Sequence, residues 1–470
     1  MKRTLWLIPP LAALAGCASV GPDYHLPAEA ALSSPYAQRA LTPPAGGLTS
    51  PDAPAGQWWR LYQDEKLNAQ VERALKANTD LRAAEANLRK ALAQETGVKA
   101  EQGPHAEISA AMQRSRFSGE SYLINEKMPV INVGDEGFSA AYQFDLFGKF
   151  RRAEEAAQAN SEAVAAAVDA ARVTVAAETA RAYLRQCSAG HALAIHQRQL
   201  ALSRRSLALA QRQRTAGRLT DSDLQRAQEQ VAQQAAQLPP LEAERQTSRL
   251  QLAALQGQPP AAAETLPACD TEPALSRPIP VGDGRSLLQR RPDVRQAERQ
   301  LAGAVAVIGV RTAELYPEIS FGLSASYTGV LEDLGSGRTA HFGLGPLISW
   351  RIPDSGARAR VASAEADSAL ALARFDGVVL NALRETETAL NTYGQDWRQR
   401  EALQTAYQHS RQLADDARRI HQAGRAPVQQ SLDADRNLAQ EEAALAAADA
   451  RIAQDQIKLF LALGGGWQKE

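Results

Sequence analysis

The sequence predicts a mainly α-helical protein with a small β part, in which a helix–β-hairpin–helix–helix repeat occurs twice. Three observations lead to this fold class. Alanine is abundant and aromatic residues make up only 5% of the 470 residues, which favours closely packed helices. Long proline-free stretches carry apolar residues at helical spacing, whereas two shorter stretches alternate apolar and polar residues. Segments of the first half also recur in the second half.

Composition and charge exclude several classes of protein. Lys and Arg total 52 against 53 Asp and Glu, and the net charge of −1 does not favour nucleic acid or another polyanion as a partner. Hydrophobic residues at 44% and charged residues at 22% are typical of a chain that folds. The length alone suggests about three domains, but the duplication replaces that estimate with two copies of one unit.

The first residues are typical of a bacterial lipoprotein signal peptide, expected over 1–16. A basic start and an apolar run precede Leu14-Ala15-Gly16-Cys17, which resembles a lipobox. Cys17 is then the expected lipidation site and begins an acylated extended segment over 17–60. An ordinary signal peptide with an incidental cysteine is the alternative. Ala18 and Ser19 follow in place of a retention aspartate, so we expect a lipid anchor in the outer membrane and a chain that extends into the periplasm.

No later window holds the roughly 18 apolar residues that a membrane-spanning helix needs. Any membrane crossing must then use strands that leave no backbone group unpaired. Two cysteines remain beside Cys17, namely Cys187 and Cys269. An oxidising periplasm permits a disulfide between them, which would close a loop of about 80 residues. Two separately buried thiols are equally compatible with the composition.

The duplication defines a first repeat over 61–270 and a second over 271–470. The stretch from Asp80 to Leu88 matches the stretch from Asp293 to Leu301, with Asp, Arg, Ala, Glu and Leu in the same places. Self-similarity at a fixed offset is typical of a structural unit that was copied.

Each repeat is expected to contain one β-hairpin, over about 104–148 and about 317–352. The clearest strand begins at Ile319, where apolar and polar residues alternate over about ten residues, the span of a tilted transmembrane strand. A soluble four-stranded sheet with one wet face is the alternative. The lipid signal and the lack of further strands to enlarge the sheet argue against that alternative.

Long helices follow each hairpin, expected over about 151–214 and 221–256 and then over about 359–422 and 431–463. A helix of about 60 residues would reach roughly 90 Å, which no compact core needs. Small alanine faces permit close packing, and Gln, Arg and Glu on the other faces are compatible with water. Periodicity does not decide between a hollow tube and a solid coiled-coil bundle.

No catalytic or metal-binding pattern occurs, so we expect neither an enzyme nor a cofactor. The seven histidines are dispersed and none belongs to a His-Glu-x-x-His arrangement. The run Gly464-Gly465-Gly466 follows a helix instead of opening one, which indicates a helix stop and not a phosphate site.

Several motifs occur in a fixed order along almost the whole mature chain. They are Cys17, Val20-Gly21-Pro22-Asp23-Tyr24 with Pro27, Trp58-Trp59 with Leu61, Asp64 and Leu67, Phe144-Asp145-Leu146-Phe147-Gly148-Lys149, Arg290-Arg291-Pro292-Asp293-Val294 with Ala297-Glu298, Leu315-Tyr316-Pro317, and Leu463-Gly464-Gly465-Gly466-Trp467. Together these motifs resemble the TolC-like outer-membrane efflux lipoproteins of the NodT type, which serve resistance-nodulation-division pumps.

The resemblance implies a homotrimer whose protomers each give four strands to a 12-stranded outer-membrane β-barrel, continued by a long periplasmic α-helical barrel. A barrel agrees with the strand count, because four strands do not close alone. The implied partners are a periplasmic adaptor (membrane fusion) protein and an inner-membrane resistance-nodulation-division pump. The implied function is a passive, gated duct that exports drugs or other small toxic compounds and so confers antibiotic resistance. Some relatives carry the cysteine pair, which favours the Cys187–Cys269 disulfide.

The resemblance also places a periplasmic gate at the helix turns. Leu432-Asp433-Ala434 and Arg436 match the second-repeat turn, so Asp433 and Arg436 are the candidate gate residues. Three copies of Asp433 around an axis would attract cations, and nearby arginines would relieve their mutual repulsion. Gln429 stands where relatives have a bulky apolar residue, which suggests a more polar seal. The alternative for Asp433 is a helix N-terminal cap, and the two roles can coexist.

Two other functions remain to be separated from efflux. One is an outer-membrane duct for type I secretion, and the lipobox with the Gly-Pro-Asp-Tyr and Leu-Gly-Gly-Gly-Trp motifs favours efflux over it. The other is a periplasmic coiled-coil lipoprotein without a pore, which would neither resist mild heating in detergent as a trimer nor conduct ions.

Overall fold

The computed structural model describes residues 19–35, 37, 39, 41–52, 56–352 and 355–465. Their contacts form two compact units. Unit 1 takes its residues from Met1–Pro27, Leu88–Val164 and Ala297–Phe375, and unit 2 from Ala28–Asn87, Ala165–Gln296 and Asp376–Glu470. Each unit therefore draws on both halves of the chain, and the two units are not the two sequence repeats.

The order of helices and strands is similar in both halves of the chain, except that the first half ends in two helices and the second, among the described residues, ends in one. The helices of the first half are α1 (Glu65–Ala77), α2 (Thr79–Ala100), α3 (Lys149–Thr215), α4 (Asp221–Ala235) and α5 (Leu238–Leu255). Those of the second half are α6 (Gly284–Arg290), α7 (Pro292–Ala313), α8 (Ser355–Gln422) and α9 (Val428–Ala462). Short 3-10 helices are η2 (Ala31–Ser33), η3 (Trp58–Tyr62), η4 (Glu120–Tyr122), η5 (Pro260–Thr265) and η6 (Leu331–Asp333). None of the described helices is long and apolar enough to cross a membrane.

The long helices are close to their expected positions, with one difference. α3 has 67 residues and α8 has 68, and each begins a few residues before its predicted start. The single helix expected over 221–256 is instead two helices, α4 and α5. Pro239 and Pro240 fall in the first turn of α5, where their missing N–H groups cost no helical hydrogen bond. In the middle of a continuous helix, Pro239 and Pro240 could not donate the usual backbone hydrogen bonds. A new helix therefore begins at Leu238.

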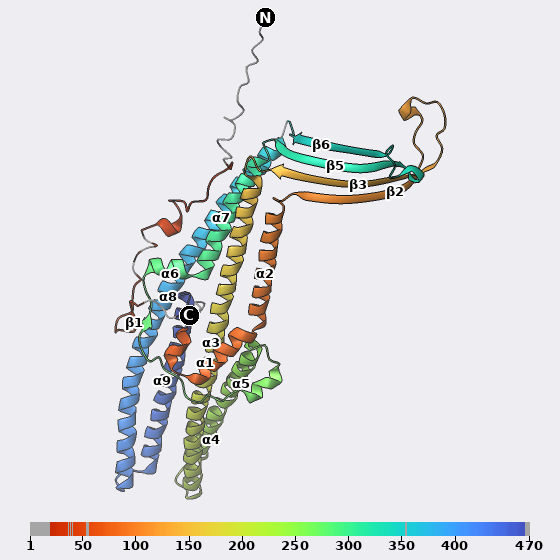
Figure 1. The fold of residues 1–470 in the computed structure, drawn as a ribbon. Coiled ribbons are helices and arrows are strands. Elements are labelled where there is room, and N and C mark those ends of the chain that lie inside the picture. The colour runs from red at the N-terminus through yellow and green to blue at the C-terminus, as the bar shows by residue number, and fades with distance from the viewer. Residues whose placement is uncertain are drawn as a thin grey trace. The chain divides into compact units, whose positions relative to one another are not determined.

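Four antiparallel strands form one sheet within unit 1, in the order β2-β3-β5-β6 (Figure 1). They are β2 (His105–Ser115), β3 (Ile131–Phe144), β5 (Glu318–Val330) and β6 (Ala340–Ser349). The two hairpins join through β3 and β5, which pair from Val133 with Val330 to Phe144 with Ile319. In the described part of the chain, β2 and β6 pair with no further strand and are the sheet edges.

Unit 2 has the main apolar core and a two-stranded sheet. Short parallel strands β1 (Thr49–Ser50) and β4 (Ile279–Pro280) pair there. The buried Trp58 ring of η3 stacks on Phe460 of α9 with centroids 4.5 Å apart. Leu67 and Val71 of α1 are fully buried in the same cluster. Burial of each such large side chain stabilises the fold by about 1.5–3 kcal/mol, so the Trp58-Trp59 motif serves the core.

Candidate functional site

The predicted gate residues lie together on the first turns of α9. Gln429, Asp433 and Arg436 are spaced so that their side chains share one helix face. The Gln429 amide donates to Asp433 Oδ1 at 3.3 Å, and the Arg436 guanidinium donates to the same carboxylate. Arg436 Nη1 also donates to Gln230 Oε1 of α4 at 2.5 Å. The structure thus brings the three residues together and adds Gln230, which sequence reasoning missed.

Asp433 is not the N-terminal cap of its helix. α9 begins at Val428, and Pro427 is the residue before its first turn. Asp433 therefore lies inside the helix, with its carboxylate engaged by Gln429 and Arg436. The alternative prediction, that Asp433 is a helix N-terminal cap, is wrong. Its carboxylate instead connects the side chains of Gln429 and Arg436 on α9.

Two similar helix turns lie at the same end of unit 2 (Figure 1). The α3–α4 turn contains Gly217 with a φ of 71°, and the α8–α9 turn contains Gly424 with a φ of 70°. Glycine adopts this left-handed conformation at helix ends without a steric penalty. The α4 start is capped by Thr220, whose hydroxyl accepts from the Asp223 N–H.

Ion pairs cross both turns. Arg214 Nε of α3 lies 2.6 Å from Asp221 Oδ1 of α4 and lowers the pKa of that carboxyl. Arg418 Nε of α8 lies 2.9 Å from Asp435 Oδ1 of α9. Such pairs can hold the helix ends in one arrangement, and they are exposed to solvent and therefore weakened by salt.

The sheet of unit 1 exposes large apolar side chains on its strands. Ile108 of β2 is 83% exposed and Phe342 of β6 is 85% exposed. Aromatic side chains gather where the strands meet the helices. The Phe147 and Tyr316 rings stack with centroids 4.5 Å apart, and Trp350 Nε1 donates to the Leu315 carbonyl at 3.1 Å. Aromatic residues at one level beside an apolar strand surface are typical of a membrane–water interface.

The N-terminal arm, residues 19–24, is bound to unit 1. The Val20 N–H donates to the Phe147 carbonyl at 3.0 Å. The Arg152 side chain is only 4% exposed, and its guanidinium donates to the Val20 and Gly21 carbonyls at 3.2 and 3.3 Å. Tyr24 donates its hydroxyl proton to Glu298 at 2.6 Å. Cys17, the predicted lipidation site, lies outside the described residues.

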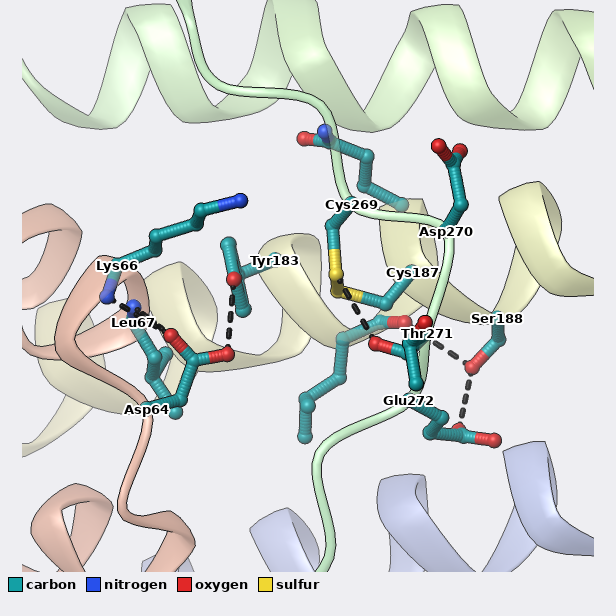
Figure 2. The surroundings of a disulfide bond; sticks show 12 residues. Asp64, Lys66, Leu67, Tyr183, Cys187, Ser188, Cys269, Asp270, Thr271 and Glu272 are labelled. Atoms are coloured by element: carbon teal, nitrogen blue, oxygen red, sulfur yellow. Dashed lines mark hydrogen bonds between the residues drawn. A yellow bond between two sulfur atoms is a disulfide. The ribbon is translucent and has the colours of Figure 1, made fainter.

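A disulfide joins Cys187 of α3 to Cys269 in the segment before β4 (Figure 2). The sequence permits either a disulfide or two separately buried thiols, and the structure has the disulfide. Two further contacts of α3 lie nearby. Tyr183 donates to Asp64 Oδ2 at 2.9 Å, and Ser188 donates to Glu272 Oε1 at 2.5 Å. The disulfide therefore belongs to a set of contacts that fasten irregular segments of unit 2 to α3.

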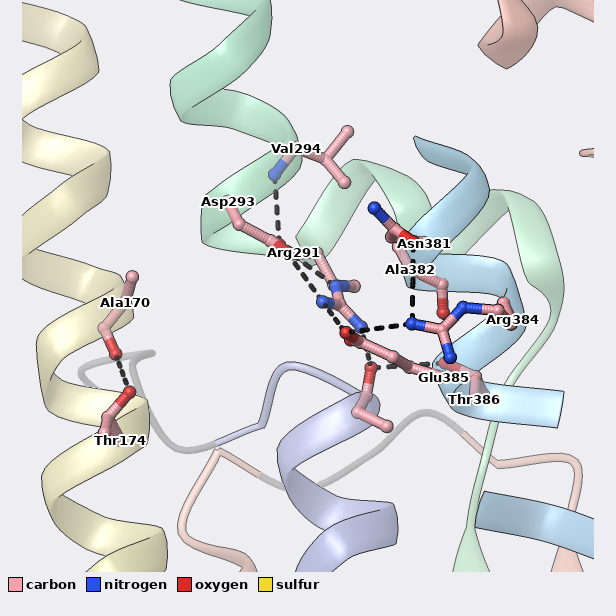
Figure 3. Close-up of polar contacts among 11 residues, drawn as sticks. Ala170, Thr174, Arg291, Asp293, Val294, Asn381, Ala382, Arg384, Glu385 and Thr386 are labelled. Carbon is pink, nitrogen blue, oxygen red and sulfur yellow. Dashed lines mark hydrogen bonds and ion pairs between the residues drawn. The ribbon is translucent and has the colours of Figure 1, made fainter. Parts of the chain in front are cut away.

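The Arg290-Arg291-Pro292-Asp293 motif caps the end of α9. Arg290 Nη2 donates to the Leu463 carbonyl at 2.7 Å, and Arg291 Nη1 donates to the Ala462 carbonyl at 2.9 Å. Figure 3 shows the Arg291 guanidinium also bound to Asp293 and Glu385, with Nη2 distances of 2.6 and 3.0 Å. Cationic side chains at terminal carbonyls stabilise a helix end. The sequence marked this motif without indicating its partner.

Metal-binding clusters are not found among the residues that the structure describes. No group of three or more His, Cys, Asp or Glu side chains there is placed to hold a metal ion.

Comparison with known proteins relates the whole chain to one class. The family model described as outer membrane efflux protein matches residues 71–258 and 284–465, two blocks that fall within the two predicted repeats. Nodulation protein T of Rhizobium leguminosarum bv. trifolii is 28% identical over 458 residues, which are 97% of this chain and 95% of that protein. The pyoverdine export outer membrane protein OpmQ of Pseudomonas aeruginosa is 30% identical over 491 residues, covering 100% of this chain and 98% of OpmQ.

Solved structures have the same fold. The outer-membrane channel OprN superposes with a TM-score of 0.85 at 32% identity, covering 96% of this chain and 100% of OprN. The CmeC outer membrane channel of Campylobacter jejuni has a TM-score of 0.83 at 20% identity, covering 96% of this chain and 95% of CmeC.

Proposed function

The chain belongs to the outer membrane efflux protein family, and we propose that three copies of it form a passive, gated duct for small compounds. The duct leads from the periplasm to the outside. It works with a periplasmic adaptor and an inner-membrane resistance-nodulation-division pump, which supplies the energy. The acyl chains of Cys17 anchor each copy in the outer membrane.

The observation that carries this proposal is the four-stranded sheet of unit 1. Its edge strands β2 and β6 leave backbone groups without a partner strand in the described chain, and its surface carries exposed Ile108 and Phe342. In hydrocarbon every backbone group needs an internal partner, and four strands are too few to close a sheet. Pairing of β2 in one copy with β6 in the next meets both requirements, and three copies close the ring.

The names of relatives support a duct that is not selective for one compound. They include a pyoverdine exporter, a fusaric acid resistance protein of Burkholderia cepacia and the cation efflux protein CusC of Escherichia coli. The compounds in these names, namely pyoverdine, fusaric acid and cations, are not of one kind. We therefore assign substrate choice to the pump and only passage to this chain.

We place the gate at the turns of unit 2, where Asp433, Arg436, Gln429 and Gln230 form a continuous set of hydrogen bonds. Breaking these bonds would free the start of α9 from α4, which opens the end of the duct. Gln429 and Gln230 make this seal polar, and that polarity supports passage of hydrated or charged compounds when it opens.

Reconstitution of the purified full-length chain tests the proposal. The expected result is a particle with the mass of three chains in detergent that conducts ions after insertion into planar lipid bilayers. A particle of one chain, or one that leaves the bilayer resistance unchanged, would exclude the duct and favour a coiled-coil lipoprotein.

A further inference from the structure

Unit 2 contains a cavity of about 570 Å³ that has no part in the proposed duct or its gate. It lies between α3, the segment that follows the disulfide, α8 and α9. The lining includes the polar and aromatic residues His191, Glu272, Tyr393, Trp397, Arg400 and Asp449. Its volume falls within the range of about 300–1,000 Å³ that is typical of small-molecule sites.

One wall of the cavity is aromatic and rigid. Tyr393 is buried, and its ring meets the Trp397 ring edge-on at a centroid distance of 6.2 Å. The Tyr393 side chain is hydrogen-bonded to Gln456, which in turn accepts from the buried Tyr62 at 2.9 Å. Trp397 is partly exposed and already carries the Arg400 guanidinium 5.7 Å from its ring centroid. This wall therefore offers π-faces of the kind that attract cations.

The lining also includes a carboxyl group that has no cationic partner in the described chain. Glu272 accepts a hydrogen bond from Ser188 (Figure 2), and within the described chain no Lys, Arg or His forms an ion pair with it. Burial, assisted by the negative charge of Asp449, raises the pKa of Glu272 to about 7, although the hydrogen bond from Ser188 acts in the opposite direction. Asp449 differs in this respect, because Arg400 Nε lies 2.9 Å from its Oδ1.

A positive charge beside Glu272 would give its carboxylate the cationic partner that Asp449 already has in Arg400. An ionised carboxylate that is taken out of water is stabilised mainly by an opposite charge at short range. Arg400 is already engaged by Asp449, and Arg277, on the loop side, is exposed to solvent. A cation that enters the cavity would therefore stabilise the ionised form of Glu272, which no cationic side chain of the described chain pairs with.

We propose that this cavity is a binding site for a small organic cation with an aromatic body. The ammonium group binds the Glu272 carboxylate, and the aromatic body packs against Trp397 and Tyr393. The proposal rests on the cavity and its lining and not on the function as a duct, so either can fail without the other.

Calorimetric titration of the purified full-length protein tests the proposal with three probes of nearly equal shape. The probes are 2-phenylethylammonium, neutral 2-phenylethanol and anionic 3-phenylpropionate. We expect the ammonium probe to bind at least tenfold more tightly than either of the others. Equal binding of all three probes, or tighter binding of the anion at Arg400 and Arg277, would overturn the proposal.

Variants assign the binding to the cavity. Glu272→Gln should abolish the preference for the ammonium probe, and Trp397→Leu should weaken its binding about tenfold. Glu264→Gln is the matched control, because Glu264 is exposed on unit 2 and does not line the cavity. If Glu272→Gln does not fold, Trp397→Leu still decides, since unchanged binding in that variant would contradict the site.

Discussion

Asp23 Oδ1 lies 2.7 Å from Arg152 Nη2, although 129 residues separate the two along the chain. The contact lowers the pKa of the Asp23 carboxyl, chiefly through the hydrogen bond from Arg152. The buried Arg152 also binds the backbone carbonyls of Val20 and Gly21, so it contacts three residues of the Val20-Gly21-Pro22-Asp23-Tyr24 motif. The N-terminal arm is therefore a fixed part of unit 1, and only a few residues separate it from Cys17.

Replacing Arg152 should release the arm. Arg152→Met leaves the Val20 and Gly21 carbonyls without their donor, and we expect a loss of about 2–4 kcal/mol in the stability of unit 1. Limited proteolysis of the purified protein should then cut within residues 19–24 much faster. The control is Arg151→Met, because that neighbouring side chain is 68% exposed. Equal cleavage of both variants would show that Arg152 does not hold the arm.

Gly21 should not tolerate a side chain. Its φ is 83°, and a Cβ at this position would lie 2.5 Å from the Gly309 Cα. Gly46 has a φ of 96° but no atom within 4 Å of such a Cβ. A substitution at Gly46 therefore measures the backbone strain alone, without the steric clash expected at Gly21. Gly46→Ala should cost about 1–2 kcal/mol from backbone strain alone. Gly21→Ala should lower the thermal unfolding temperature by clearly more, and a shift no larger than that of Gly46→Ala would argue against the close approach.

The gate proposal predicts a change in conductance. Asp433→Ala combined with Arg436→Ala removes the bonds that link α9 to Gln230 of α4, and single-channel conductance in planar bilayers should rise. Asp416→Ala combined with Arg419→Ala is the control. That pair has the same spacing on α8, and in the described chain Arg419 bonds to no other helix. Unchanged conductance in the Asp433 and Arg436 variant, or an equal rise in the control, would contradict the gate.

Glu272 should make unit 2 less stable as the pH rises. Its carboxyl has a pKa of about 7 in the folded protein and 4.5 as its ordinary value, so folding favours the protonated form. The stabilisation is complete below pH 4.5 and is lost as the pH rises to about 7, by at most about 3 kcal/mol. The charged and titratable groups that line the same cavity as Glu272 are His191 on α3, Arg277 on the loop, Tyr393 and Arg400 on α8 and Asp449 on α9.

The comparison with Glu272→Gln isolates this contribution, because the variant keeps all of those groups. Thermal unfolding of both proteins between pH 4.5 and 8 should show the difference in unfolding temperature changing with pH. A constant difference across that range would mean that the pKa of Glu272 is not raised.

Local patterns predicted the elements well where one physical rule dominates. The alternation of apolar and polar residues predicted the strand from Ile319 onward, which is β5 in the structure. The absence of proline predicted the extent of α3 to within a few residues. The break between α4 and α5 was missed because Pro239 and Pro240 are tolerated in a first turn, and periodicity does not show a restart. The repeats predicted over 61–270 and 271–470 stay a prediction, since the compact units mix residues of both.

The candidate sites were predicted less completely because their partners are distant in sequence. Asp433 and Arg436 could be found from a local motif, but Gln230 lies 206 residues before Arg436 and no pattern connects them. No sequence pattern connects Arg152 or Arg291 to its partners, and only the fold shows that they bind the N-terminal arm and the end of α9. The sequence did single out Arg291, because it belongs to the Arg290-Arg291-Pro292-Asp293-Val294 motif, whereas Arg152 belongs to no such motif.

In the proposed assembly, three copies of this chain close one conducting pore. Mass determination of the purified full-length protein in detergent, followed by conductance measurement of that same particle in planar bilayers, tests it most directly. We expect a particle of three chains that conducts ions in discrete steps and separates into single chains, with loss of conductance, only on strong heating. A single-chain particle, or a trimer that never conducts, would contradict it.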